Sequence, residues 1–585
     1  MPSWDEEVDF LVVGSGAGGM VAALRAHDLG CRTLVVEKAP VYGGSSAISG
    51  GVVWVPANHL MAGAGIEDSP EAGLRYLEKI TAGSSSPEKL RAYVDTAPRM
   101  LEYLDERSHI GFDVIPGYPD YYPEEEGGKT GGRSCEPRVF DAGRLGDEFR
   151  RQNMHPKDIY IFGFMTGRAT DGKDMMRGGL KGALIILREA LLYFFNLKAR
   201  FKRLHNTRCT LGGALVASAR ASLLDRGVPV WLDTKLEDLV EEEGRITGAV
   251  VTREGEPLRI AARRGVLLAA GGFERNEKLR EQYQRGPTGS EWTAGTVSNT
   301  GDTVAIGQRL GAAFDLLEDA WWCPVFRAPF EEHRRILIFE RSLPGGIVVN
   351  SLGRRFMNEA APYNDAVKRI YAANSQESQE SEEALGASTI PSYLIFDRRF
   401  RRKYPIGPIF PANMQPDWAT GEKAEGFLER ADTLEGLAAK LGVDAAGLRA
   451  TVERFNDFAR SGKDEDFGRG ESAQDRYYTI FDDAPNPNLA TIEKAPYYGC
   501  KLWPGDLGTK GGLRTDLHAR VMREQGDVIP GLYATGNCSA AVMGHTYPGA
   551  GGTLGPAMTF GFRAAEHAGG EAEECAAPRA AAGHG

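Results

Sequence analysis

Cysteine is scarce in this chain, and its spacing does not suggest a structural role. The seven cysteines are scattered, odd in number and without a C-x-x-C pair, so we expect neither a disulfide framework nor a metal site. Unpaired cysteines suit a reducing compartment, which predicts a cytoplasmic protein. The acidic N-terminus passes directly into an apolar strand, and no signal or transit peptide is expected there.

Positive charge is also in short supply. The 69 lysines and arginines are outnumbered by 80 aspartates and glutamates, giving a net charge of −11, which argues against a nucleic-acid partner. No uninterrupted apolar run approaches the roughly twenty residues that a membrane-spanning helix needs. The length of 585 residues and the hydrophobic fraction of 42% are sufficient for two domains with a cofactor cleft between them.

A dinucleotide fingerprint stands near the beginning of the chain. An apolar strand runs into the sequence GSGAGG at residues 14–19, and a second strand ends at Glu37. Gly14 allows the tight turn, Gly16 lets the backbone approach a pyrophosphate, and Gly19 permits close packing of helix on strand. The helix N-terminus offers free N–H groups to the anion, and Glu37 would accept a hydrogen bond from the adenosine ribose.

Three further segments favour FAD as the dinucleotide. Residues 38–51 resemble the flavin-contacting loop of the FAD enzymes related to succinate dehydrogenase and fumarate reductase. Residues 265–273 and 531–537 each read as a buried strand ending in a glycine turn, where α/β sheets hold their ligands. The helix that opens after residues 552–554 would direct its N–H groups at the N1/O2 edge of the flavin. The residues expected to bind the cofactor are Gly14, Gly16, Ala17, Gly18, Gly19, Glu37, Lys38, Gly43, Gly44, Ser45, Ser46, Gly50, Gly51, Ala270, Gly271, Gly272, Gly536, Asn537, Gly552, Thr553 and Leu554.

Two residue types are missing at positions that matter. No histidine occurs in residues 44–51, so we expect FAD to be bound non-covalently. No arginine occurs in residues 544–558, just where fumarate reductases would carry one for dicarboxylates. A site without a guanidinium clamp is poorly suited to a doubly charged acid. The turn YPGAG at residues 547–551 offers instead a phenol and a backbone N–H, which together suit one neutral carbonyl oxygen.

This turn resembles that of the 3-ketosteroid Δ1-dehydrogenases, in the fumarate reductase and succinate dehydrogenase flavoprotein superfamily. The resemblance extends to GGSS at 43–46, NTGD at 299–302, DAWWCP at 319–324 and DLGTKGG at 506–512. It implies an α/β fold, with a Rossmann-like FAD-binding domain and an inserted α+β substrate domain. The expected boundaries are 1–319 and 509–575 for the FAD-binding domain, 320–508 for the insert, and 576–585 for a flexible tail.

The resemblance also implies which residues form the site, and it implies a 3-oxosteroid 1-dehydrogenase activity of the kind used in steroid degradation. Tyr547 and the Gly551 amide would hold the C3 carbonyl oxygen of a 3-ketosteroid and favour its enol. Tyr363 would take the C2 proton, with Tyr121 as its hydrogen-bonded helper, and Tyr122 takes that place if the register slips by one residue. A phenol of pKa about 10 can act as a base if a neighbouring donor stabilises its phenolate. Hydride would then leave C1 for flavin N5, which makes the C1–C2 double bond.

A basic and apolar insert lies at about residues 152–205, where the chain is longer than the family's shorter members. Between residues 171 and 208 there are nine Lys/Arg and three Asp/Glu, a local excess of positive charge. Residues 181–204 predict a peripheral contact with the inner face of the cytoplasmic membrane, which would suit a quinone as the external electron acceptor. A helix packed on the protein or at a subunit contact is the alternative.

Two other functions stay open at this stage. One is a related flavoenzyme acting at another ring bond, a 3-ketosteroid Δ4-dehydrogenase or an enoate reductase. The other is a flavin electron-transfer protein at the membrane surface without steroid turnover.

Leucines at three- and four-residue spacing also predict one helical stretch over residues 433–461.

Overall fold

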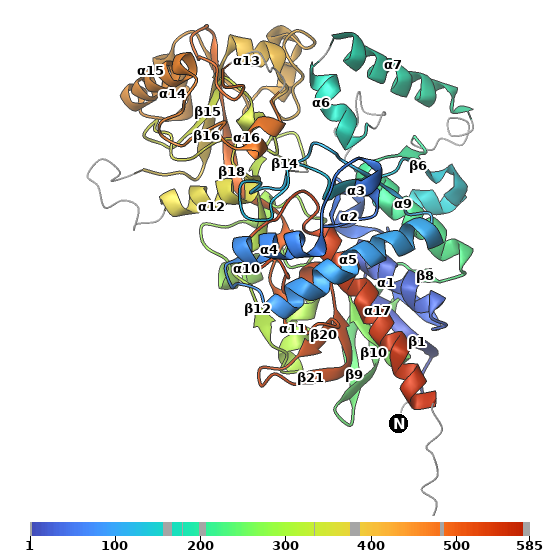
Figure 1. The fold of residues 1–585 in the computed structure, drawn as a ribbon. Helices are drawn as coiled ribbons and strands as arrows, with labels where there is room; N and C mark the ends of the chain where they lie inside the picture. The colour runs from blue at the N-terminus through green and yellow to red at the C-terminus, as the bar shows by residue number, and fades with distance from the viewer. Residues whose placement is uncertain are drawn as a thin grey trace, which may run out of the picture.

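The computed structural model describes residues 3–155, 167–177, 179–197, 206–332, 334–374, 387–479 and 485–576. Figure 1 shows a lower body that contains both termini of this part of the chain, and an upper body on its left side. Two helices, α6 and α7, stand apart at the upper right. Residues 577–585 of the predicted tail (576–585) lie outside the described residues, as do residues 156–166, 178 and 198–205 of the predicted insert.

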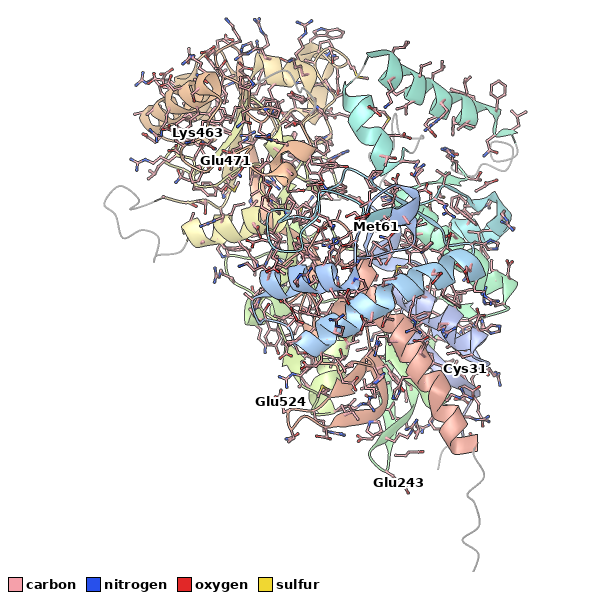
Figure 2. All side chains as sticks on the ribbon, in the orientation of Figure 1. Cys31, Met61, Glu243, Lys463, Glu471 and Glu524 are labelled. Atoms are coloured by element: carbon pink, nitrogen blue, oxygen red, sulfur yellow. The ribbon has the colours of Figure 1, made fainter. Side chains whose placement is uncertain are left out.

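The lower body is built on an eight-stranded sheet of order β20-β21-β11-β1-β2-β8, with β10 and β9 added on β11. Strands β1 (Glu6–Val13), β2 (Thr33–Val36), β11 (Glu256–Leu268) and β21 (Val528–Ala534) run parallel. Strands β8 (Val230–Trp231), β9 (Thr234–Glu242), β10 (Arg245–Arg253) and β20 (Arg520–Met522) complete the sheet. Turns at Glu243 and Glu524 mark its lower rim (Figure 2).

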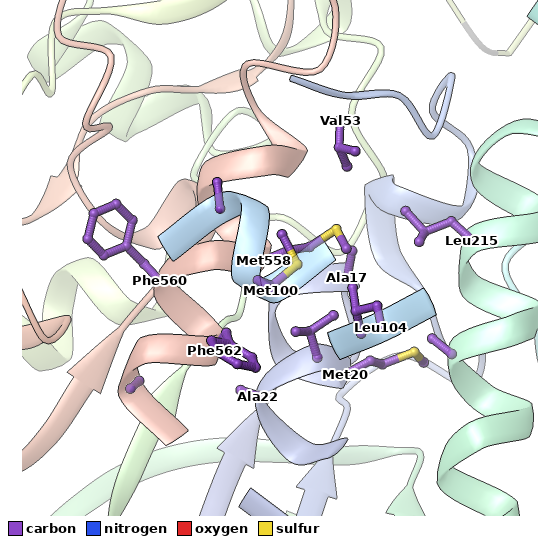
Figure 3. Close-up of a cluster of buried hydrophobic side chains, with 14 of the residues drawn as sticks. Ala17, Met20, Ala22, Val53, Met100, Leu104, Leu215, Met558, Phe560 and Phe562 are labelled. Carbon is purple, nitrogen blue, oxygen red and sulfur yellow. The ribbon is translucent and has the colours of Figure 1, made fainter. Parts of the chain in front are cut away.

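Four helices cover one face of this sheet and enclose its largest apolar core. They are α1 (Ala17–Asp28), α5 (Pro87–Arg107), α9 (Leu211–Asp225) and α17 (Leu554–Ala576). Met20, Met100 and Met558 come from three of these helices and meet in the cluster that Figure 3 shows. Parallel strands need cover on their faces, and these helices supply it on one face of the sheet.

The upper body is a six-stranded antiparallel sheet of order β14-β13-β18-β16-β15, with β17 on β18. Its strands are β13 (Ala320–Phe326), β14 (Arg335–Ile336), β15 (Gly346–Val349), β16 (Ser392–Asp397), β17 (Glu429–Ala431) and β18 (Tyr497–Thr509). Helices α12 (Tyr363–Asn374), α13 (Arg398–Lys403) and α16 (Ala473–Tyr477) pack around it. This α/β body with a second, antiparallel domain confirms the predicted fold class, whereas the exact boundaries stay a prediction.

The helical stretch predicted over residues 433–461 is two helices. Helix α14 (Leu434–Leu441) ends at Gly442, whose φ of +75° is left-handed, and α15 (Ala445–Ser461) begins after the cap Asp444. The prediction of one helix was therefore wrong at its centre, because a left-handed glycine ends a helix.

Helices α6 (Ala169–Arg177) and α7 (Gly179–Phe195) form an arm within the predicted insert. Buried Glu136 accepts hydrogen bonds at the start of α6 from the Ala169 N–H at 2.8 Å and the Thr170 hydroxyl at 2.6 Å. Buried Glu189 of α7 accepts from Arg208 Nε at 3.0 Å. Among the described residues, no helix combines the length and the apolar character that a bilayer span requires.

Candidate active site

The β1–α1 turn has the shape that the fingerprint predicts. Gly14 has a φ of +105°, and a Cβ at this position would lie 2.3 Å from the Ala269 carbonyl oxygen. A Cβ at Gly19 would lie 2.3 Å from the Gly14 carbonyl oxygen. Both positions therefore require glycine, one for its backbone conformation and one for the close approach of helix to strand.

The N-terminus of α1 faces the small-residue segment 43–51. Gly16 occupies the N-cap position and has no side chain to accept a capping hydrogen bond. The Ala17 N–H, which follows it, donates to Ser46 Oγ at 3.0 Å. The other N–H groups of the first turn have no intrahelical acceptor, which is the chemistry that an anion such as a pyrophosphate requires. Glu37 lies beside this turn, where its carboxylate accepts from the Ser15 N–H at 3.0 Å and the Ser15 hydroxyl at 2.6 Å.

The turn after β11 meets the same segment through a buried polar cluster. Asn299 Nδ2 donates to Ser45 Oγ at 3.2 Å and to Glu274 Oε1 at 2.6 Å. Burial, reinforced by the nearby Asp506 carboxylate, raises the pKa of Glu274 to about 7. The cluster thus joins the predicted turn at residues 270–272 to the flavin-contacting loop.

The predicted cofactor residues therefore gather at one edge of the parallel sheet, and they fit a dinucleotide. Lys38, which follows β2, has its ammonium 2.7 Å from Asp302 Oδ2 and 2.6 Å from the Thr300 hydroxyl. The set comprises the β1–α1 turn (Gly14, Gly16, Ala17, Gly18, Gly19), the end of β2 (Glu37, Lys38), the 43–51 segment (Gly43, Gly44, Ser45, Ser46, Gly50, Gly51), the turn after β11 (Ala270, Gly271, Gly272), the turn after β21 (Gly536, Asn537) and the start of α17 (Gly552, Thr553, Leu554).

Three tyrosines from distant parts of the chain form a triangle of rings. The ring centroids of Tyr121 and Tyr363 are 5.4 Å apart, those of Tyr121 and Tyr547 5.3 Å, and those of Tyr363 and Tyr547 5.4 Å. Tyr363 begins α12, and Tyr547 lies in the turn before α17. The structure therefore brings together all three tyrosines that the sequence singled out.

The three hydroxyl groups differ in their surroundings. Tyr121 is buried, and its hydroxyl has no hydrogen-bond partner among the described residues. Burial raises the pKa of Tyr363 well above the ordinary value, the Tyr547 ring adds to this rise, and the Tyr121 hydroxyl acts in the opposite direction. Tyr122 turns away from the triangle, and its hydroxyl donates to Asp365 Oδ1 at 3.0 Å.

The turn that contains Tyr547 presents a phenol and a free amide. The Tyr547 hydroxyl lies 3.0 Å from the Thr553 hydroxyl. Gly551 accepts a hydrogen bond from the Trp54 N–H at 3.2 Å, but its own N–H has no acceptor in the part of the chain that the structure describes. A donor without a partner in the protein is open to an acceptor that a ligand supplies. This pair of donors suits one ligand oxygen.

Sequence reasoning gave no role to a buried ionic group beside Tyr547. Asp319 Oδ2 lies 3.7 Å from the Lys510 ammonium and 3.1 Å from His545 Nδ1. Burial raises the pKa of Asp319, but the Lys510 and Lys368 ammonium groups outweigh that effect and the pKa falls to about 2. Trp321 joins this group to the cofactor edge, since its Nε1 donates to Asn537 Oδ1 at 3.1 Å. The motifs at 319–324 and 506–512 contain these residues, but sequence spacing does not reveal that they meet.

Comparisons with known proteins identify the family of this chain. A family model described as the FAD binding domain matches residues 9–554. The 3-oxosteroid 1-dehydrogenase of Mycobacterium tuberculosis (strain ATCC 25618 / H37Rv) is 45% identical over 96% of this chain and 98% of its own. The crystal structure of 3-ketosteroid Δ1-dehydrogenase from Sterolibacterium denitrificans in complex with 1,4-androstadiene-3,17-dione is 46% identical and superimposes with a TM-score of 0.91, covering 97% of this chain and 100% of that one. The 3-ketosteroid Δ4-(5α)-dehydrogenase from Rhodococcus jostii RHA1 shares the fold at a TM-score of 0.64, over 97% of this chain and 98% of that one, but is only 20% identical.

Proposed function

Since the chain belongs to the FAD-dependent 3-ketosteroid Δ1-dehydrogenases, a branch of the fumarate reductase and succinate dehydrogenase flavoproteins, we propose that three tyrosines and one glycine amide perform its reaction. The activity is 3-oxosteroid 1-dehydrogenation, which introduces a C1–C2 double bond into a 3-ketosteroid. The observation that carries the assignment of residues is the tyrosine triangle beside the free Gly551 amide.

Tyr547 and Gly551 hold the C3 carbonyl oxygen of the substrate. The phenol and the amide N–H both donate to this oxygen, and their bonds strengthen as negative charge develops on it during enolisation. Because the Tyr547 side chain is buried, water competes little for the oxygen once the steroid is bound. The same polarisation makes the C2 proton more acidic.

Tyr363 takes that proton, and Tyr121 assists it. Burial works against the phenolate of Tyr363, so the base needs a donor close to its oxygen. The Tyr121 hydroxyl is buried and makes no hydrogen bond of ordinary geometry to a described residue, although it lies close enough to the Tyr363 and Tyr118 hydroxyls to act against the rise in the pKa of each. It is therefore available for this bond. Tyr121 therefore acts as the helper, and Tyr122 is engaged elsewhere by Asp365.

FAD supplies the acceptor for the C1 hydride when it is bound. The chain holds it non-covalently, because residues 44–51 contain no histidine for a covalent link. The turns at residues 14–19 and 536–537 would hold it, the first of them with the N–H groups at the start of α1 directed at its phosphates. The N-terminus of α17, at residues 552–554, favours negative charge on the flavin.

The arm of α6 and α7 rests on the inner face of the cytoplasmic membrane. On α7 the residues Gly182, Ile185 and Glu189 are buried, while a row of apolar side chains around the rest of the helix surface is 46–78% exposed. These are Leu180, Leu184, Leu187, Leu191, Leu192, Phe194 and Phe195. So large an exposed apolar row, next to the basic stretch from Lys198 to Arg203, suits an anionic lipid surface. A membrane quinone is then the natural external acceptor.

Anaerobic mixing with androst-4-ene-3,17-dione tests the assignment of function. The bound flavin should be bleached, and the product should be the 1,4-diene. A product desaturated at another bond would refute the Δ1 assignment. A flavin that stays oxidised with this steroid, yet is reduced by dithionite, would favour an electron-transfer protein.

A further inference from the structure

The loop that contains Tyr547 is held by hydrogen bonds to the carbonyl groups on both sides of this residue. Lys368 donates to the His545 carbonyl oxygen, and the Lys510 ammonium donates to that of Thr546 at 2.9 Å. After Tyr547, the Pro548 carbonyl oxygen accepts from the Tyr76 hydroxyl at 2.7 Å and the Tyr121 N–H at 3.0 Å. The backbone is therefore anchored before and after Tyr547, and the buried donors among these anchors are the ones that water cannot replace.

Lys510 differs from the other donors in being a completely buried ammonium group. Its relative exposure is 0%, and its Nζ lies 4.5 Å from the centroid of the Trp321 ring. That ring meets the Tyr547 ring edge-on, with centroids 4.9 Å apart. Lys510 thus touches both neighbours that fix Tyr547, namely the backbone of Thr546 and the ring of Trp321.

Burying an ammonium is costly, and structure alone gives little reason to keep one here. Burial lowers the pKa of Lys510 to about 8 in spite of the Asp319 carboxylate. An apolar residue of similar volume would often stabilise such a position equally well or better. What an apolar residue lacks is a donor for the Thr546 carbonyl.

We propose that Lys510 is a positioning residue, which sets the Tyr547 phenol beside the Gly551 amide by donating a hydrogen bond to the Thr546 carbonyl oxygen. This inference rests on the proposed roles of Tyr547 and Gly551. Replacing Lys510 by methionine lets the turn relax, so that the ketone oxygen loses its alignment with both donors. Glutamine keeps a neutral N–H donor and restores part of the alignment.

The test compares Lys510→Met and Lys510→Gln in the FAD-loaded enzyme. The first readout is the carbonyl stretching frequency of bound 1,4-androstadiene-3,17-dione labelled with ¹³C at C3, measured by infrared difference spectroscopy. The second is kcat/KM for androst-4-ene-3,17-dione. We expect Lys510→Met to move the carbonyl band toward its frequency in free steroid and to lower kcat/KM about 10²-fold. Lys510→Gln should recover part of both.

Lys368→Met is the matched control, because it removes an ammonium from the neighbouring carbonyl of the same loop. The Lys368 side chain is 38% exposed, so water can replace its ammonium, and kcat/KM should stay within about threefold. Tyr547→Phe tests the proposed role of Tyr547 separately from the proposed role of Lys510. If Tyr547→Phe leaves the carbonyl band unchanged, the proposed role of Tyr547 fails.

If Tyr547→Phe moves the carbonyl band and Lys510→Met does not, only the proposed role of Lys510 is overturned. The same conclusion follows if Lys510→Gln shows as large a loss of kcat/KM and as large a band shift as Lys510→Met. Should Lys510→Met lose FAD, Lys510→Gln decides alone. A band close to the wild-type frequency then supports the inference, and a band at the free-steroid frequency refutes it.

Discussion

Tyr121 and Tyr122 are neighbours in the chain, but their hydroxyl groups have different partners. The Tyr121 ring packs between Tyr363 and Tyr547, at centroid distances of 5.4 and 5.3 Å, and its hydroxyl has no partner among the described residues. The Tyr122 hydroxyl donates to Asp365 at 3.0 Å. One of the two is therefore available to the reaction, and the other stabilises the fold.

Substituting each of these tyrosines by phenylalanine should separate activity from stability. For Tyr121→Phe we expect kcat to fall about 10²-fold with little change in stability, because the lost hydroxyl has no hydrogen bond to give up. For Tyr122→Phe we expect kcat within about threefold and a loss of roughly 1–2 kcal/mol in the free energy of unfolding. Steady-state turnover measures the change in kcat, and thermal unfolding measures the change in stability. The reverse pattern would mean that Tyr122 is the helper.

Tyr363→Phe removes the proposed base. We expect FAD binding to persist and kcat to fall about 10³-fold, within the range of general-base catalysis. Tyr371→Phe is the control on the same helix, since the Tyr371 hydroxyl donates to the Pro287 carbonyl at 3.1 Å and lies outside the triangle. Flavin bleaching after anaerobic mixing with steroid measures the step. A Tyr363→Phe variant that retained most of its activity would show that another group takes the proton.

The same base predicts a pH dependence. Because burial raises the pKa of Tyr363 well above its ordinary value, the phenolate is the minor form near neutral pH. The rate of flavin bleaching should therefore rise with pH, and the rise should vanish in Tyr363→Phe. Stopped-flow absorbance over the pH range in which the protein stays folded checks this, and a rate that falls with pH would contradict it.

Gly551→Ala should misplace the amide that holds the ketone. A Cβ at Gly551 would lie 2.4 Å from the Val53 carbonyl carbon, and the φ of +96° is already left-handed. We expect a loss of at least about 2 kcal/mol in the free energy of unfolding and a fall of about 10²-fold in kcat/KM. Gly526→Ala is the control, because its φ is +94° and a Cβ there would meet nothing within 4 Å. Equal effects of the two substitutions would leave backbone strain as the whole explanation.

The cofactor edge and the Tyr547 turn could be predicted because glycine reports local backbone geometry. Gly14 and Gly19 fit a single kind of strand–turn–helix connection, which is visible in sequence spacing. The meeting of Tyr121, Tyr363 and Tyr547 came instead from resemblance to a family, since nothing in their spacing brings three distant segments together. The triangle confirms that they are neighbours, while their roles stay a prediction.

What the sequence could not reveal is burial of charge. Lys510 and Asp319 read as ordinary polar residues within motifs, yet both are buried beside Tyr547. The α7 segment shows the opposite case, because its leucines resemble a core and half or more of several side chains is exposed. Exposure depends on tertiary packing, which composition and periodicity do not determine.

The exposed row on α7 should mediate lipid binding. We expect the triple variant Leu184→Gln, Leu191→Gln and Phe195→Gln to lose most of its co-sedimentation with anionic vesicles, because each burial of such a side chain in lipid contributes roughly 1.5–3 kcal/mol. Glutamine keeps the helical propensity, so turnover of androst-4-ene-3,17-dione should stay within about twofold. Leu224→Gln, at a leucine that is 39% exposed on the lower body, is the control. Undiminished binding of the triple variant would exclude α7 as the contact.

Glu274 should make the stability of the protein depend on pH near neutrality. Its pKa is about 7, raised first by burial and then by Asp506, whereas in the unfolded chain it returns to about 4.3. The folded state therefore binds the proton more tightly. The resulting stabilisation is fully present below the unfolded pKa and is lost as the pH rises through about 7.

Glu274→Gln mimics the protonated form at every pH and keeps an acceptor for Asn299, which donates to Glu274 at 2.6 Å. We expect the variant and the wild type to unfold at similar temperatures at about pH 5, and the variant to be more stable by up to about 3 kcal/mol at about pH 8.5. Calorimetry of the FAD-saturated proteins measures the difference, with Glu243→Gln, an exposed carboxylate in the β9–β10 turn, as the control. A Glu274→Gln variant whose stability followed the wild-type pH profile would show that the Glu274 carboxylate is ionised in the folded protein throughout this range.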